Sequence, residues 1–161
     1  MMLFKILTVM VVAFLSACSS SVDDVSGYNE KLFAYEKKLN ECNRLETTGI
    51  EGEKISGVSE DAIRVGLTYF YIKNSLDCTA KEADALASSV EALIDGQIAA
   101  EYIKINARSL KESISFQSKQ LLEPENRFNA LSDNEKKVLN KISISNRPFS
   151  PSAALEYYID K

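Results

Sequence analysis

The sequence predicts an all-α protein, a bundle of four or five helices that follows a cleaved N-terminal signal peptide. Apolar residues recur in steps of three and four along most of the chain, which is the period of an amphipathic helix. Two capping boxes, Thr79–Glu82 and Ser132–Glu135, mark helix starts. The 161 residues include only 6 Gly and 3 Pro, so few positions interrupt a helix. This length suits one domain behind the signal peptide.

The N-terminal segment carries a targeting pattern. Lys5 precedes the apolar run Ile6–Leu15, which is too short for a bilayer span of about 20 residues but suits a signal peptide. The run ends in Leu15-Ser16-Ala17-Cys18, and this order resembles the lipobox of bacterial lipoproteins. The resemblance implies that residues 1–17 are removed and that Cys18 receives the lipid. The alternative is an uncleaved membrane helix with an ordinary thiol at Cys18.

The residues after Cys18 bear on localisation. Ser19, rather than Asp, follows the modified cysteine, and by resemblance to lipoproteins this implies transport to the outer membrane. Residues 18–27 are small and polar and are expected to form the lipidated N-terminus and a tether. Residues 28–161 then form a helical domain that faces the periplasm.

The charge of the mature chain argues against nucleic-acid binding. Residues 18–161 contain 18 basic and 23 acidic side chains, a net charge of −5, which provides no field that attracts phosphates. Residues 22–101 carry a net −8 and residues 102–161 a net +3. Either these two parts attract each other within the fold, or the C-terminal part presents a basic face to an acidic partner.

The first expected helix contains one of the two remaining cysteines. Its apolar stripe consists of Tyr28, Leu32, Tyr35, Leu39 and Cys42. Residues 47–57 follow as a loop with three glycines.

An even pair of cysteines in an exported protein predicts a disulfide between Cys42 and Cys78. The alternative is a pair of buried free thiols. Two Cys without any His cannot complete a zinc shell, so we expect no metal.

The second expected helix runs from an N-cap at Ser59 to about Asp77. Apolar residues cover most of its circumference, which is typical of a helix in the middle of a bundle, and Gly66 would allow a close helix crossing. A strand through Val65–Ile72 is the alternative, because this segment is rich in β-branched and aromatic residues.

The remaining elements follow from caps and prolines. A helix starts at Thr79 and is interrupted at Asp95-Gly96, and a long stripe from Ile98 to Glu123 ends at Pro124. Ser132 opens a shorter helix with Val138, Leu139 and Ile142 inside. Residues 147–151 contain two prolines and are expected to be irregular, after which Ser152 caps a final turn or two through Tyr158.

The residue inventory favours a non-catalytic protein. The chain has no His, which removes the usual base for a Ser or Cys nucleophile, and it contains no Ser-x-x-Lys motif. The carboxylate pairs Glu51/Glu53 and Glu60/Asp61 lie in or beside the loop, where charged residues are usually solvated. We therefore expect no enzyme activity and no cofactor.

Three tyrosines are candidates for contact with a partner. Tyr69-Phe70-Tyr71 cannot all face one core, because three successive helical positions span about 200°. Tyr71 falls near the narrow polar face of this helix and is expected to be the most exposed residue of the triplet. Tyr157 and Tyr158 are also neighbours, so they cannot both face one core. Either these side chains pack at the edge of the core with a solvated hydroxyl, or they form an aromatic groove for a partner helix or tail.

These observations define three function hypotheses. The first is a lipoprotein that holds or escorts another envelope protein; it looks similar in architecture, though not in any motif, to pilotins, which are small helical disulfide-bonded lipoproteins that bind a secretin tail. The second is an inhibitor or immunity-type lipoprotein, with the 47–57 loop as the inhibitory element. The third is an envelope enzyme.

Overall fold

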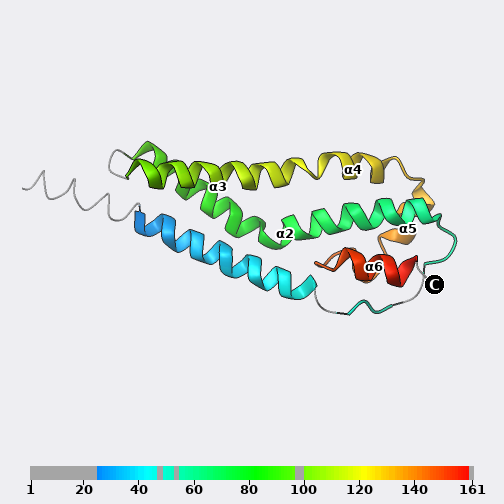
Figure 1. The fold of residues 1–161 in the computed structure, drawn as a ribbon. Coiled ribbons are helices and arrows are strands. Elements are labelled where there is room, and N and C mark those ends of the chain that lie inside the picture. Colours follow the sequence, from blue (N-terminus) through cyan, green and yellow to red (C-terminus); the bar gives the residue numbers. More distant parts are fainter. Residues whose placement is uncertain (1–24, 47–48, 53–54, 97–99, 160–161) are drawn as a thin grey trace, which may run out of the picture. The chain divides into compact units, whose positions relative to one another are not determined.

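The computed structural model describes residues 25–46, 49–52, 55–96 and 100–159, so the lipobox, Cys18 and most of the predicted tether lie outside the described residues. The prediction of an all-α fold is confirmed: the described residues contain helices and no strand. The first helix covers residues 25–46, and five further helices follow it within the described part of the chain (Figure 1). They are α2 (Glu60–Asp95), α3 (Glu101–Lys119), α4 (Leu122–Asn129), α5 (Asp133–Leu139) and α6 (Pro151–Tyr158). None of the helices in the described residues has the length and apolar character needed to span a bilayer.

The chain divides into two compact units. Unit 1 comprises Met1–Tyr35 and Glu82–Glu112, and unit 2 comprises Glu36–Lys81 and Ser113–Lys161. The first helix, α2 and α3 therefore each contribute residues to both units. Within unit 1 the buried side chains come from these three helices: Tyr28, Tyr35, Ala83, Leu86, Val90, Leu93 and Ala107.

Unit 2 has the larger core, and α2 contributes buried side chains to it. Buried residues of α2 pack against side chains of α4, α5, α6 and the segments between them: Ile63, Val65, Leu67, Phe70, Phe128, Leu139, Ile142, Ile144, Phe149, Ala154 and Tyr158. The ring of Tyr69 stacks on Phe128 with centroids 4.4 Å apart, and Phe70 meets Phe128 edge-on at 5.2 Å. The interpretation of α2 as a helix with few exposed faces is confirmed for this half, and the alternative strand is not formed.

Gly66 allows α2 and α5 to approach closely. A Cβ atom at Gly66 would lie 2.9 Å from Leu139 Cδ1, and Leu139 is fully buried. Any larger residue at position 66 would have to displace this buried side chain. The predicted role of this glycine in a close helix crossing is confirmed.

Asn74 ties α2 to the irregular segment before α6. Its side-chain amide donates two hydrogen bonds, each 2.9 Å long, to the backbone carbonyls of Ile144 and Arg147. Asn74 is buried, and its position satisfies two carbonyls that no helix or strand pairs. One polar side chain thus fixes the course of the chain between α5 and α6.

Two predicted helix starts are confirmed by their hydrogen bonds. The Ser59 hydroxyl accepts from the backbone N–H of Ala62 at 3.2 Å, as an N-cap does. At α5 both halves of the capping box are present between Ser132 and Glu135. The predicted interruption after Asp95 is the C-terminus of α2.

Three predicted boundaries are wrong. No helix starts at Thr79: α2 continues through it, because the Thr79 hydroxyl bonds back to the carbonyls of Ser75 and Leu76 instead of capping a new helix. Pro124 does not end a helix but lies in the first turn of α4, where the missing N–H costs nothing. The cap of α6 is Ser150 rather than Ser152, since its hydroxyl accepts from Ala153 N and Pro151 occupies the first position.

Candidate functional site

The predicted disulfide is present within unit 2. Cys42 of the first helix and Cys78 of α2 are bonded at an S–S distance of 2.05 Å, with their Cα atoms 6.2 Å apart. The alternative of two free thiols is therefore excluded. The bond joins the first helix to α2, and Figure 1 shows these two helices running antiparallel. Asn43 and Thr79, the residues that follow the two cysteines, line the same groove.

A groove of about 230 Å³ lies beside this disulfide, and we name it the disulfide groove. Its residues come from the first helix, from α2, and from α3 with the turn that follows it. Four apolar side chains line it: Leu39, Tyr71, Ile72 and Leu76. Six polar residues complete it: Asn43, Glu46, Ser75, Thr79, Gln117 and Gln120.

Tyr71 is the aromatic residue of the groove. It is half-buried, and its ring meets Phe149 of the core edge-on with centroids 6.1 Å apart. Burial raises the pKa of the Tyr71 hydroxyl, and the nearby Glu46 carboxylate raises it further. The phenol therefore stays protonated at neutral pH and can donate a hydrogen bond to an occupant.

The polar lining of the groove is mostly uncharged. The Ser75 hydroxyl donates to the Glu46 carboxylate at 3.5 Å, and the Thr79 hydroxyl is engaged with α2 backbone. Within the part of the chain that the structure describes, the side-chain amides of Asn43, Gln117 and Gln120 take no hydrogen-bond partner. Each amide offers both donors and an acceptor, the combination that pairs with peptide groups.

These amides were not predicted as site residues. Gln117 does stand out in the sequence, because it continues the helical spacing of the apolar residues Ala107, Leu110 and Ile114 but is polar. Leu39 was expected to be buried but is 39% exposed, and it forms part of the groove wall. A polar residue at an expected core position and an apolar residue exposed to solvent are therefore the two features that point to the groove.

Tyr157 and Tyr158 do not lie in the groove. The Tyr157 hydroxyl donates to the carbonyl of Gly52, so this side chain holds the 47–57 loop against α6. Tyr158 is buried in the core of unit 2, and its hydroxyl has no hydrogen bond of normal geometry. The burial of Tyr158 favours the alternative in which this side chain packs against the core.

The described parts of the 47–57 loop are bound to the C-terminal part of unit 2. Arg147 donates from Nη2 to the carbonyl of Gly49 at 2.9 Å, and the Ser143 hydroxyl donates to the carbonyl of Glu51. Beyond the loop, the carboxylate of Glu60 accepts from Arg64 on the α2 surface at 2.7 Å. Glu60, one of the carboxylates considered for catalysis in the sequence, is thus held in a surface ion pair with Arg64.

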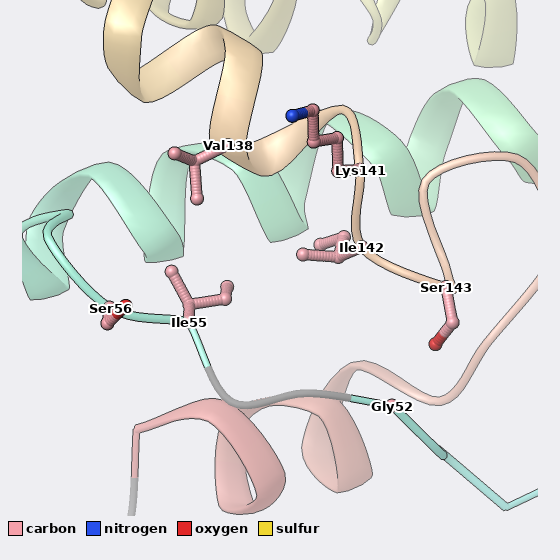
Figure 2. Close-up of a pocket in the computed structure, with 7 residues that line it drawn as sticks. All are labelled: Gly52, Ile55, Ser56, Val138, Lys141, Ile142 and Ser143. Carbon is pink, nitrogen blue, oxygen red and sulfur yellow. The ribbon is translucent and has the colours of Figure 1, made fainter.

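A second cavity of about 430 Å³ lies between the loop and the α5–α6 segment (Figure 2). Figure 2 shows Ile55, Val138 and Ile142 around it, together with Lys141 and Ser143. Residues 53–54, which come between Gly52 and Ile55 in the sequence, lie outside the described residues. We assign no function to this cavity for that reason.

Comparison of the chain with models of protein families, with characterised proteins and with solved structures gives no match. The fold therefore defines the class of the protein: it is an all-α protein whose first two helices are joined by a disulfide.

Proposed function

We propose that the mature protein is a lipoprotein of the outer membrane that holds a segment of another envelope protein in the disulfide groove. Cys18 carries the lipid, and the domain faces the periplasm. The protein performs no catalysis; binding is its function. The lipobox supports the anchor, and the composition of the groove supports the binding role.

The observation that carries this proposal is the position of Tyr71. Its half-buried phenol stands among Leu39, Ile72 and Leu76, with unpaired amides along the edge. Apolar anchors surrounded by adaptable hydrogen-bonding groups are typical of a peptide-binding groove. A polypeptide segment with two or three apolar side chains would fill the floor and pair its backbone with Asn43 and Gln117.

The alternative function, an inhibitor or immunity-type lipoprotein, draws less support. It requires an element that enters the active site of another protein, and the 47–57 loop was the candidate. Three hydrogen bonds to Gly49, Glu51 and Gly52 hold the described parts of this loop to the domain. The groove is therefore our preferred binding site.

Site-specific photocrosslinking in intact cells tests the proposal. A benzophenone amino acid replaces Gln117 in the groove, and the same residue replaces Asn129, which is exposed on α4, in a control. We expect a discrete crosslinked protein from position 117 and none from position 129. Equal crosslinking from both positions, or none from either, would contradict a binding role for the groove.

A matched pair of substitutions sharpens this test. Leu39→Glu places a charge in the groove, whereas Leu122→Glu places one at another exposed leucine of unit 2. Both leucines are accessible to solvent, so neither change should disturb the core. We expect Leu39→Glu to abolish the crosslink from position 117 and Leu122→Glu to leave it intact.

A further inference from the structure

The start of α3 presents apolar side chains to solvent. Tyr102 is 68% exposed and Ile105 is 55% exposed, whereas the apolar residues of unit 1 that form its core are buried. The two are three positions apart, so they project from the same face of the helix. Within unit 1, the polar residues Ser109 and Glu112 follow on that face. The next exposed apolar residue of α3, Phe116 at 61%, belongs to unit 2.

Hydrogen bonds of Lys104 join the start of α3 to the end of α2. The Lys104 ammonium donates to the carbonyl of Ile94 at 3.1 Å and also to the carbonyl of Gly96. Both carbonyls lie at the C-terminus of α2, where a cation is favoured by the helix dipole. Tyr102 and Ile105 are therefore exposed on a helix start that Lys104 ties to α2.

The first helix begins at the same end of unit 1. In Figure 1 the start of this helix lies at the same end as the C-terminus of α2 and the start of α3, and all three belong to unit 1. The core of this unit contains Tyr28 from the first turn of that helix and Leu93 from the last turn of α2. From Cys18 to Val25 the chain advances seven residues and spans at most about 25 Å.

We propose that this end of unit 1, the α2–α3 tip, rests in the interface of the membrane to which Cys18 anchors the protein, with Tyr102 and Ile105 as the inserted side chains. The inference rests on the proposed anchor but is independent of the groove. A phenol and an aliphatic side chain suit the boundary between headgroups and acyl chains.

The charges at the tip select the kind of lipid surface. Asp95 and Glu101 are acidic, Lys104 and Arg108 are basic, and Arg108 pairs with Glu101 at 3.3 Å. The tip therefore has no excess of positive charge that would draw it to anionic lipid. A zwitterionic surface, such as phosphatidylethanolamine, is the lipid class that it fits.

The absence of Trp from the sequence provides a direct probe, because one introduced Trp reports its own surroundings. The full lipidated chain carrying Tyr102→Trp is reconstituted into phosphatidylethanolamine and phosphatidylcholine vesicles that contain brominated acyl chains. Phe33→Trp serves as the matched control: Phe33 is 70% exposed in the same unit but lies eight residues, or about 12 Å, beyond Val25 along its helix. Ile105→Trp provides a second reporter if the first variant does not fold.

We expect the emission of the Tyr102→Trp variant to shift to the blue and to be quenched by brominated lipid, and that of the Phe33→Trp variant to remain unquenched. Adding phosphatidylglycerol should not increase the quenching. Flotation of the vesicles tests the anchor separately. Protein that floats while neither tip reporter is quenched overturns this inference and leaves the anchor standing, and equal quenching at position 33 overturns it as well. Protein that fails to float removes the anchor and the inference together.

Discussion

Asn74→Ala should be among the most destabilising single substitutions in unit 2. The change removes two hydrogen bonds of 2.9 Å and leaves the carbonyls of Ile144 and Arg147 without their partner. Each lost bond costs about 0.5–1.5 kcal/mol, and a buried acceptor left unpaired costs about 1–3 kcal/mol. The better helix propensity of Ala returns about 0.5 kcal/mol. We therefore expect the free energy of unfolding to fall by about 2–4 kcal/mol.

Urea unfolding followed by circular dichroism measures this change. Asn106→Ala is the matched control, because Asn106 is an exposed residue inside α3 and the same substitution there changes only helix propensity. The control should be neutral or slightly more stable than the parent protein. A loss below about 1 kcal/mol for Asn74→Ala, with an unchanged denaturant slope, would refute the role of Asn74 as the tie between α2 and the α5–α6 segment.

Three further predictions concern caps, burial and the disulfide. Hydrogen bonds from the Ser132 hydroxyl and backbone N–H lower the pKa of the Glu135 carboxyl. Its contribution to stability is therefore present above the unfolded pKa of about 4.3 and is lost as the pH falls through the folded pKa. The melting temperature of Glu135→Gln should depend less on pH in that range than that of the parent protein, and an unchanged pH dependence would contradict this. Burial raises the pKa of the Tyr158 hydroxyl, so the contribution of this residue to stability is fully present below about pH 10 and is lost as the pH rises through the raised pKa. Tyr158→Phe should be at least as stable as the parent protein at pH 7 and should lose less stability in alkali. A marked loss of stability at pH 7 would show that the hydroxyl has a partner that the fold needs. The double variant Cys42→Ser, Cys78→Ser should lose about 4 kcal/mol, because the bond closes a loop across a sequence separation of 36; thermal unfolding that is the same with and without reductant would contradict this.

The helical class was predictable because it depends on local pattern. The stripe that contains Tyr28, Tyr35 and Cys42 is buried at those three positions, and both the cap at Ser59 and the box at Ser132 form as the sequence indicates. Each of these signals involves residues within a few helical turns of one another. They can therefore be read from the sequence without knowledge of the packing.

The errors fall where a residue type suits two local structures. A Thr followed by a Glu three residues later fits a capping box, but Thr79 also fits a helix interior when its hydroxyl bonds to the preceding turn. Pro124 fits a helix end or a helix start equally well. The packing of neighbouring elements decides between the two, and the sequence does not display that packing.

The candidate site was only partly predictable. Tyr71 was singled out because three successive aromatic positions on a helix cannot share one face. The groove around it also needs Asn43 and Gln117, which come from helices far apart in the sequence, and no short motif links them. The burial of Tyr158 was not predictable either, because it depends on how α6 packs against the rest of unit 2.

The state of Cys18 tests the central claim most directly, because the proposed anchor and the α2–α3 tip both depend on it. Mass spectrometry of the N-terminal tryptic peptide from the membrane fraction identifies its first residue and its modification. We predict a peptide that begins at Cys18 and carries acyl chains, and we predict its loss in Cys18→Ser. A peptide that includes residues before Cys18, or an unmodified Cys18, would contradict the account.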